Sequence, residues 1–282
     1  MDKLCDLHTH SCFSDGTYTP AQLLEKAQTL GLGAIALTDH NTAQGLPDFL
    51  AAAKNYRVEA VPGVEFSTDY EGTELHILGL FIQPRYFDEI TEKMADMQRR
   101  KEESNRELVE NLRRAGFDLD YDHICEKTVG QINRAHIAAE LTELGYTASV
   151  QEAFSTLLGA KHGYYNPPER IDACEMICYI RSIGAVPVLA HPFLSLKEEG
   201  ALRRFLGPAK EAGLVGMEVL YSKYTEEQTR LAEELVKEFG ILPSGGSDFH
   251  GEVKPDISLG TGRGPLKVPL TFLDGMKKAV SM

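Results

Sequence analysis

Histidines and acidic residues of this sequence fall in short motifs whose spacing suits metal binding. His8 and His10 lie two residues apart in the segment Asp6–His10. Residues two apart on a β-strand point to the same face, so both imidazoles could bind one metal ion. Asp15 follows in a Ser-Asp-Gly turn. An HxH pair alone is weak evidence, because chance or a core location gives the same spacing.

Further motifs place a histidine or an acid near the end of an apolar segment. These motifs are Thr38-Asp39-His40-Asn41, Val64-Glu65-Phe66, Leu189-Ala190-His191-Pro192 and Ser247-Asp248-Phe249-His250. A buried Glu65 needs a cation or hydrogen-bond partners, because burying an unpaired charge is costly. His76 lies near the start of its apolar segment, and by itself it would be interpreted as a core histidine. Together the motifs predict a multinuclear site, and imidazole and carboxylate donors without thiolates suit Zn²⁺, Mn²⁺ or Fe²⁺.

Strand and helix patterns alternate along the chain outside a central segment. Apolar runs predict strands at residues 4–7, 34–37, 58–66, 75–81, 185–190, 214–220 and 241–244. Helical patterns are predicted at residues 20–30, 171–183, 201–212 and 225–239. Such βα alternation is typical of a parallel sheet, either open and doubly wound or closed into a barrel. The motifs would then lie where α/β proteins carry their sites, at the carboxyl ends of strands.

The central segment has a different, helical pattern. Residues 88–115 are highly charged and contain neither Gly nor Pro. Further helices are predicted at 133–145 and 149–158. We interpret residues 88–168 as an inserted α-helical subdomain, because three consecutive helical segments interrupt the βα alternation. The expected catalytic domain then consists of residues 1–87 and 169–282.

The composition excludes several classes of protein. Of 282 residues, 29 are Lys or Arg and 42 are Asp or Glu, so the formal net charge is −13. This acidic balance argues against an extended nucleic-acid-binding surface but permits a small anionic substrate. No apolar run approaches the roughly 20 residues of a membrane span, and no signal-peptide pattern follows Met1. The five scattered cysteines form no CxxC pair, and we expect a cytoplasmic protein without a membrane partner.

As a set, the motifs resemble those of the polymerase and histidinol phosphatase (PHP) family. The matching segments are, in order, DLHTHSCFSDG, LTDHN, PGVEFS, ELHILG, LAHP and GSDFHG, and they span residues 6 to 251. The resemblance implies an α/β fold, a distorted (β/α)₇ barrel, and phosphoesterase chemistry on two or three divalent metal ions (Mn²⁺, Fe²⁺ or Zn²⁺). It also implies nine metal ligands, which are His8, His10, Asp15, His40, Glu65, His76, His191, Asp248 and His250.

The resemblance further implies how the ligands are shared among the ions. The three groups are His8, His10, Glu65 and Asp248; Glu65, His76 and His191; and Asp15, His40 and His250. Hydroxide from metal-bound water would attack phosphorus. The predicted catalytic residues are Glu65, which would bridge two ions, and Asp248 and His191, which by location alone are candidates to protonate the leaving oxygen.

The insert resembles that of family members described as nucleoside 3′,5′-bisphosphate phosphatases or as 5′-to-3′ exonucleases on short RNA. The matching segments are Ile132–Ala138 and Gly163–Pro168. Arg134 and His136 lie at a predicted helix N-terminus, where free N–H groups favour anions, and an arginine can bind phosphate through two parallel hydrogen bonds. We predict that both residues bind a phosphate of the substrate, a small phosphorylated nucleotide or the 5′ end of a short RNA. A solvated arginine and a capping histidine are the alternative.

Other functions are left open by the sequence. The same site could hydrolyse histidinol phosphate or a ribose cyclic phosphate. An amidohydrolase-type enzyme also uses an HxH motif, but it usually needs a bridging carboxylated lysine. A non-catalytic metal-binding scaffold is less favoured, because all nine ligand positions are filled. The native metal, the occupancy of the third site and the oligomeric state do not follow from the sequence.

Overall fold

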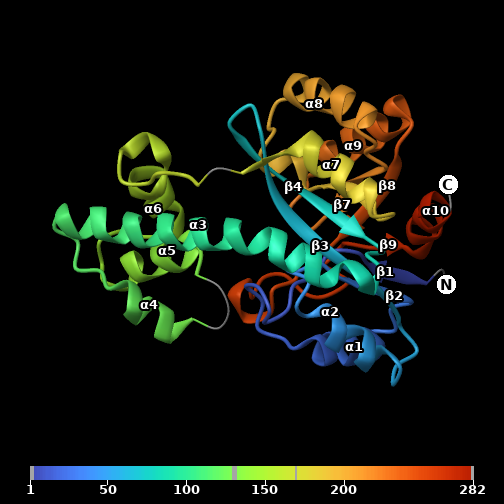
Figure 1. The fold of residues 1–282 in the computed structure, drawn as a ribbon, viewed down its shortest axis with the longest axis horizontal. Coiled ribbons are helices and arrows are strands. Elements are labelled where there is room, and N and C mark those ends of the chain that lie inside the picture. The colour runs from blue at the N-terminus through green and yellow to red at the C-terminus, as the bar shows by residue number, and fades with distance from the viewer. Residues whose placement is uncertain (1–2, 129–131, 169, 281–282) are drawn as a thin grey trace. The chain divides into compact units, whose positions relative to one another are not determined.

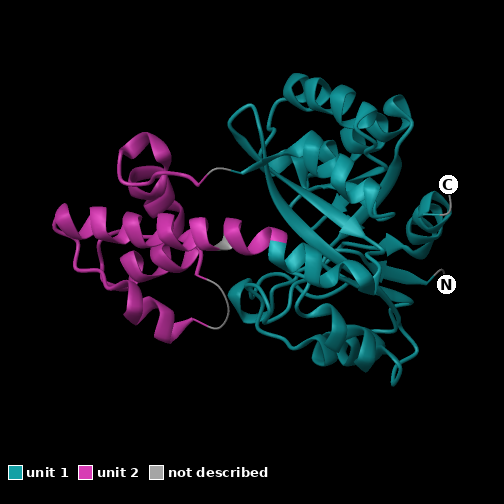
Figure 2. Ribbon diagram, in the orientation of Figure 1, with its two compact units in different colours: residues 1–92, 170–282 teal, residues 93–169 magenta. Residues whose placement is uncertain are grey.

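The chain divides into two compact units. A computed structural model describes residues 3–128, 132–168 and 170–280. The larger unit comprises Met1–Glu92 and Arg170–Met282, and the smaller unit comprises Lys93–Glu169 (Figure 2). The smaller unit thus lies within the chain close to the expected insert at 88–168. Its role in substrate binding stays a prediction.

The larger unit is built on one mixed, nearly closed sheet. Its strands are β1 (Leu4–Asp6), β2 (Ala34–Leu37), β3 (Glu59–Tyr70), β4 (Thr73–Leu80), β5 (Ile171–Asp172), β6 (Val186–Ala190), β7 (Gly216–Tyr221), β8 (Leu242–Gly246) and β9 (Val268–Pro269). Their order is β8-β7-β6-β4-β3-β2-β1-β9, with β5 beside β3. The Leu7 N–H donates to the Gly245 carbonyl at 3.2 Å, which brings the segment after β1 against β8. The expected barrel-like α/β architecture is confirmed.

Two strands depart from the parallel sheet that the βα alternation predicts, the short β9, which pairs antiparallel with β1, and β4. Strand β4 pairs antiparallel with both β3 and β6. It follows β3 through a two-residue turn, in which Glu71 and Gly72 both have positive φ, as tight hairpins require. The start of β4 therefore lies at the same edge of the sheet as the carboxyl ends of the parallel strands. His76 is consequently opposite Ala190, next to His191.

Helices surround this sheet and close one end of it (Figure 1). They are α1 (Pro20–Thr29), α2 (Leu46–Ala53), α7 (Ala173–Ser182), α8 (Glu199–Glu211), α9 (Glu226–Phe239) and α10 (Leu270–Val280), with 3₁₀ turns η1 (Pro84–Tyr86), η4 (Pro192–Leu194) and η5 (Gly251–Val253). Helix α10 packs against β1, β6, β8 and β9. Its Leu273 and Met276 join a buried cluster with Leu7, Leu78 and Val188. This apolar core leaves the other end of the barrel for polar groups.

The smaller unit is a separate helical bundle. Its elements are α3 (Phe87–Arg114, which begins in the larger unit), α4 (Tyr121–Lys127), α5 (Arg134–Glu143), α6 (Val150–Ala153), the π-helical turn η2 (Phe154–Leu158) and the 3₁₀ turn η3 (Ala160–His162). Leu112, Ile137 and Leu141 form part of its own apolar core. The helix predicted at 149–158 is α-helical only to Ala153. None of the helices in the described ranges is both long and apolar enough to cross a membrane.

Strand β8 lies very close to the segment that follows β1. A Cβ atom added to Gly246 would lie 2.6 Å from the backbone nitrogen of His8 and would also overlap its side chain. Only glycine allows this approach, because the obstacle includes backbone that cannot rotate away. The approach places Asp248 beside His8, since the Asp248 N–H donates to the His8 carbonyl at 2.9 Å.

We expect Gly246→Ala to lower the free energy of unfolding by about 3 kcal/mol or more, at the upper end of overpacking costs. Gly275→Ala in α10 is the matched control. Its added Cβ would meet only Leu242 at 4.0 Å, and alanine is favoured over glycine in a helix by roughly 0.5–1 kcal/mol. Denaturant unfolding of both variants measures the difference. Equal stability of the two variants would contradict the close approach of β8 and β1.

Candidate metal centre

All nine sequence-predicted metal ligands lie at one end of the barrel, in four overlapping groups. The donor atoms within each group lie within 4.8 Å of one another. The groups are His10, Asp15, His40 and His250; His8, Glu65 and His191; His8, His10 and Asp248; and His40, Glu65 and His76. Segments from β1 to the loop after β8 thus contribute to one cluster.

Glu65 is at the middle of the cluster, and its two oxygens face different histidines. Oε1 lies 2.7 Å from His76 Nδ1 and 2.9 Å from His191 Nε2. Oε2 lies 3.1 Å from His8 Nε2 and 3.2 Å from His10 Nε2. The Glu65 side chain is fully buried. Its geometry is that of a carboxylate able to bridge two cations.

Asp248 adds a second carboxylate beside the HxH pair. Its Oδ1 lies 3.3 Å from His10 Nε2 and 3.7 Å from His8 Nε2. Its Oδ2 points away from the histidines and accepts hydrogen bonds from Tyr221 Oη at 2.8 Å and Lys254 Nζ at 2.9 Å. One carboxylate oxygen of Asp248 therefore faces the cluster, and the other is held by hydrogen bonds to residues that are not among the nine predicted ligands.

The carboxylate of Asp15 lies near two further histidines, His40 and His250. Its Oδ1 lies 3.2 Å from His250 Nε2 and 3.8 Å from His40 Nε2. The other ring nitrogen of His40, Nδ1, lies 3.1 Å from Glu65 Oε2. His40 therefore lies between the Asp15 group and the Glu65 group.

The donor set fits divalent cations better than it fits a hydrogen-bond network. His10 Nδ1, Glu65 Oε2 and His250 Nε2 are buried polar atoms without a hydrogen-bond partner among the described residues. His8 Nε2 and His10 Nε2 face each other at 3.1 Å. Buried polar atoms are normally paired, so unsatisfied atoms that converge on one point need an explanation. Imidazole and carboxylate donors around a shared cation supply one.

Electrostatics keep the carboxylates ionised. Burial disfavours the charge on Glu65, but the imidazoles of His40 and His8 outweigh it and hold the pKa of Glu65 well below its ordinary value. The pKa of Asp248 is likewise lowered against burial, first by Lys254. Burial also opposes a charge on His10, yet the adjacent carboxylates of Asp248 and Glu65 raise the pKa of His10 to about 9. Protons therefore compete with metal ions for this imidazole, as is usual for histidine ligands.

The sequence motifs missed Glu218, a buried acid on β7. Its Oε1 accepts a hydrogen bond from His8 Nδ1 at 3.0 Å. Its Oε2 accepts the backbone N–H of His191 at 2.6 Å, where His191 has a φ of 27°. Glu218 thus orients one histidine ring and holds the strained backbone of another. The signal in the sequence was an acid inside the apolar run Gly216–Leu220.

Two further buried acids hold the loops of the site. Asp6 accepts the Ser247 N–H at 2.8 Å and the Gly260 N–H at 2.8 Å. Asp39 accepts the Ser11 N–H at 2.7 Å and the hydroxyl of Ser14 at 2.6 Å. Both acids stand next to predicted ligand motifs in the sequence, and they fix the backbone rather than face the cluster.

Arg134 and His136 both lie in the first turn of α5, in the smaller unit. The guanidinium carbon of Arg134 lies 4.3 Å from the ring centre of Tyr165 and 5.7 Å from that of Phe154. His136 Nδ1 accepts the Asn133 N–H at 3.1 Å and forms a capping box. One ring nitrogen of His136 therefore has the capping role that the sequence left as the alternative.

A family model and curated relatives match this chain. The model described as the PHP domain matches residues 6–164. A 5′-3′ exoribonuclease of Haemophilus influenzae is 32% identical over 250 residues, which cover 89% of this chain and 91% of that protein. A phosphoribosyl 1,2-cyclic phosphate 1,2-diphosphodiesterase of Eggerthella lenta is 29% identical (88% and 94% covered). A 3′,5′-nucleoside bisphosphate phosphatase of Chromobacterium violaceum is 27% identical (89% and 90% covered).

The fold also matches a solved structure over nearly its whole length. The protein, from Bifidobacterium adolescentis, is described as a candidate metal-dependent phosphoesterase. The TM-score is 0.81 at 27% sequence identity, with 97% of this chain and 95% of that chain covered. The barrel with its helical insert is therefore shared with that protein.

We expect Glu218→Gln to weaken metal binding by about 10- to 100-fold, in the range seen when partners of metal-ligating histidines are changed. The carboxylate accepts two N–H groups, but a glutamine has only one amide oxygen, and the His191 backbone can only donate. The amide NH₂ must then face His8 Nδ1, which favours the tautomer protonated on Nε2 and removes the lone pair that faces Glu65. Metal titration calorimetry measures the affinity, and ¹⁵N NMR reports the tautomer.

Glu233→Gln, an exposed change in α9, is the control for this substitution. It removes the same charge and should bind metal like the wild type. Wild-type metal affinity in Glu218→Gln would show that Glu218 does not orient His8.

Proposed function

This chain belongs to the PHP domain family of metal-dependent phosphoesterases, and on that premise we propose that it hydrolyses a phosphate ester of a small nucleotide. It is a phosphoric ester hydrolase, and what we propose is its substrate, its metal stoichiometry and the roles of its residues. The single observation that supports the proposal best is the gathering of nine imidazole and carboxylate donors, the buried Glu65 among them, in four overlapping groups.

Charge favours a phosphorylated substrate at this centre. The nine ligands include three carboxylates (Asp15, Glu65 and Asp248), which contribute −3. Three divalent ions would contribute +6, so the loaded centre would have a charge of about +3 within a protein of −13. A phosphate dianion is therefore attracted locally, although the protein as a whole repels it.

We assign three groups of residues to two or three divalent ions, Mn²⁺, Fe²⁺ or Zn²⁺. The groups are His8, His10, Glu65 and Asp248; Glu65, His76 and His191; and Asp15, His40 and His250. When bound, the ions supply Lewis acidity and lower the pKa of water so that it can act as a nucleophile near neutral pH. Glu65 holds two of the groups together through its separate oxygens. His191 lies beside Glu65, and Asp248 lies beside His10. Both therefore remain candidates to protonate the leaving oxygen.

We further propose that the substrate has a second phosphate or a 5′-phosphorylated end, which Arg134 and His136 bind. The Haemophilus influenzae and Chromobacterium violaceum relatives are named for RNA and bisphosphate substrates, which supports this choice. The Tyr165 ring packs on the guanidinium of Arg134, which also donates to the Leu158 carbonyl at 3.4 Å. An arginine can bind phosphate through two parallel hydrogen bonds. The acidic net charge favours a small substrate over a long RNA, and cytoplasmic location stays a prediction.

A cyclic phosphate is the second candidate substrate. The Eggerthella lenta relative is named for a phosphoribosyl cyclic phosphate, and its identity to this chain is similar to that of the nucleotide-specific relatives. Histidinol phosphate is a third candidate substrate, because its hydrolysis would use the same metal-dependent chemistry. A non-catalytic scaffold is disfavoured, because each of the nine predicted ligand positions carries a residue that can bind a metal ion.

Phosphate release from a panel of esters tests the proposal. We expect the Mn²⁺-loaded protein to hydrolyse 3′-phospho-AMP or a short 5′-phosphorylated RNA at least about tenfold faster than AMP, with loss of activity on chelation. Preference for the doubly phosphorylated substrate follows from the second phosphate contact. Activity confined to histidinol phosphate or to a ribose cyclic phosphate would refute the nucleotide substrate while retaining the metal chemistry.

Arg134→Ala should lower kcat/KM by about 10- to 100-fold while metal content stays at the wild-type value. The reason is the loss of a charge-assisted hydrogen bond to the second phosphate, without any change among the metal donors. Arg113→Ala, an exposed arginine paired with Glu110 on α3, is the matched control. Unchanged kinetics of Arg134→Ala on the preferred substrate would rule out the role given to the insert.

A further inference from the structure

Lys254 places an ammonium group at the edge of the metal centre. Its Nζ lies 2.9 Å from Asp248 Oδ2, and its side chain is 29% exposed. The ammonium therefore contacts a predicted ligand on one side and reaches solvent on the other.

The loop that carries Lys254 is rigidly built. Lys254 ends the turn η5, its N–H donates to the Gly251 carbonyl at 3.2 Å, and its carbonyl accepts the Ile257 N–H at 3.0 Å. Gly251 has a φ of 71° and packs so closely on Tyr18 that a Cβ atom there would lie 2.8 Å from the ring. This loop holds the lysine at a defined place only four residues after His250.

Asp248 does not need Lys254 to satisfy its outer oxygen. Tyr221 Oη already donates to the same Oδ2 atom at 2.8 Å. An ammonium has three N–H donors, and the bond to Asp248 uses one of them. The remaining donors of Lys254 are available at the partly exposed side of the centre.

The position of Lys254 favours an anion at the loaded centre. In this structure the ammonium pairs with the carboxylate of Asp248. Divalent ions on the carboxylates would weaken that attraction and leave the ammonium beside a positive centre. An anion between the ions and the ammonium would reduce this repulsion.

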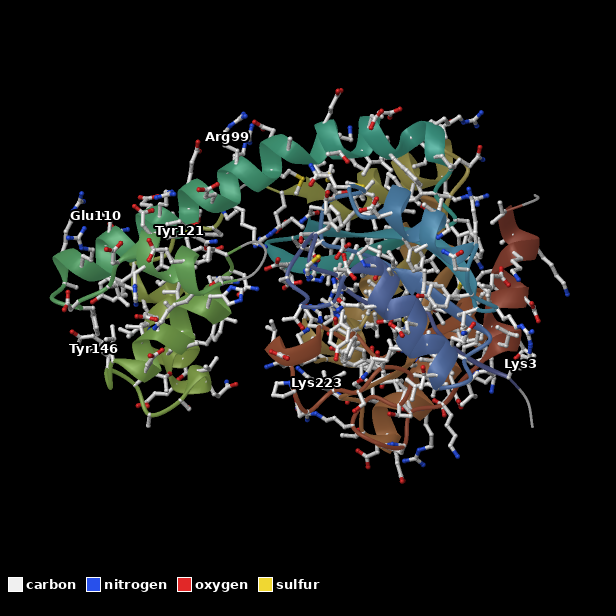
Figure 3. The ribbon with its side chains drawn as sticks, turned by 90° about the horizontal axis from the view of Figure 1, so that it is seen from below. Lys3, Arg99, Glu110, Tyr121, Tyr146 and Lys223 are labelled. Carbon is white, nitrogen blue, oxygen red and sulfur yellow. The ribbon has the colours of Figure 1, made fainter. Side chains whose placement is uncertain are left out.

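A second lysine lies on the neighbouring loop. Lys223 (Figure 3) follows Ser222, whose hydroxyl donates to the Ser247 carbonyl at 2.5 Å, one residue before Asp248. Burial, and next the ammonium of Lys254, lower the pKa of Lys223.

We propose that Lys254 is a substrate-binding residue, which donates a hydrogen bond to a non-bridging oxygen of the phosphoryl group held at the metal centre. This proposal rests on the proposed phosphoesterase function and extends it, because it assigns part of phosphate binding to an ammonium in the larger unit rather than to the ions alone.

Inorganic phosphate is the probe, and Lys254→Met is the test variant. Calorimetric titration of the Mn²⁺-loaded protein with phosphate should show an affinity about 10- to 100-fold weaker in Lys254→Met than in the wild type. Lys254→Arg should recover most of the loss, because arginine retains the charge and the donors. The Mn²⁺ content of both variants should equal that of the wild type.

Tyr221→Phe separates phosphate binding from a purely positioning role. It removes the other hydrogen bond to the same Asp248 oxygen but no charge. If Lys254 binds phosphate, Tyr221→Phe keeps phosphate affinity within about threefold of the wild type. Lys277→Met, which breaks an exposed pair with Glu59, should do the same.

Two results would overturn the proposal. One is wild-type phosphate affinity in Lys254→Met. The other is an equal loss of Mn²⁺ in Lys254→Met and Tyr221→Phe, which would mean that both residues only orient Asp248. Failure of the proposed function is a different observation, namely a wild-type protein that binds Mn²⁺ and phosphate but hydrolyses no ester of the panel.

Discussion

The buried carboxylate of Glu65, surrounded by imidazoles, is the interaction on which the rest of the structure depends. Without cations, the full or partial burial of three acids and six histidines in one place is opposed by desolvation. The folded chain meets this cost with partial pairing between acids and histidines, visible in the lowered pKa of Glu65 and the raised pKa of His10. The site is therefore preorganised for cations, and much of the barrel serves to hold donors that would otherwise separate.

The barrel holds them through a surrounding set of buried acids and close backbone contacts. Glu218 fixes His8 and His191, while Asp6 and Asp39 fix the loops after β8 and β1. The apolar core lies between α10 and the site, so the polar cluster occupies only one end of the barrel. The apolar packing and the polar cluster thus occupy opposite ends of the barrel.

Local patterns in the sequence predicted the order of elements and the positions of the motifs. Strands that are buried on both faces, such as β2 and β6, appear as uninterrupted apolar runs, and their ends are easy to find. The composition of β4 does not show its direction, but the eight residues between the predicted strands 58–66 and 75–81 are too few for the crossover that a parallel pair needs. His76 was hard to interpret from its place at the start of a strand. Glu218 was missed for another reason, since its partners are 27 and 210 residues away.

The pairing of β1 has a consequence for how the chain is made. The first strand lies between β2 and β9, and the backbone after it bonds to β8, so two of its partners are among the last elements of the chain. During synthesis a ribosome-bound chain can pair β1 with β2 but must leave its other edge open until Val268 and Pro269 emerge. Such long-range closure is slow and exposes strand edges to aggregation. His8 and Asp248 are 240 residues apart, so they can meet only after β8 and the loop that follows it have been made. A cation that needs both side chains could therefore bind fully only late in folding.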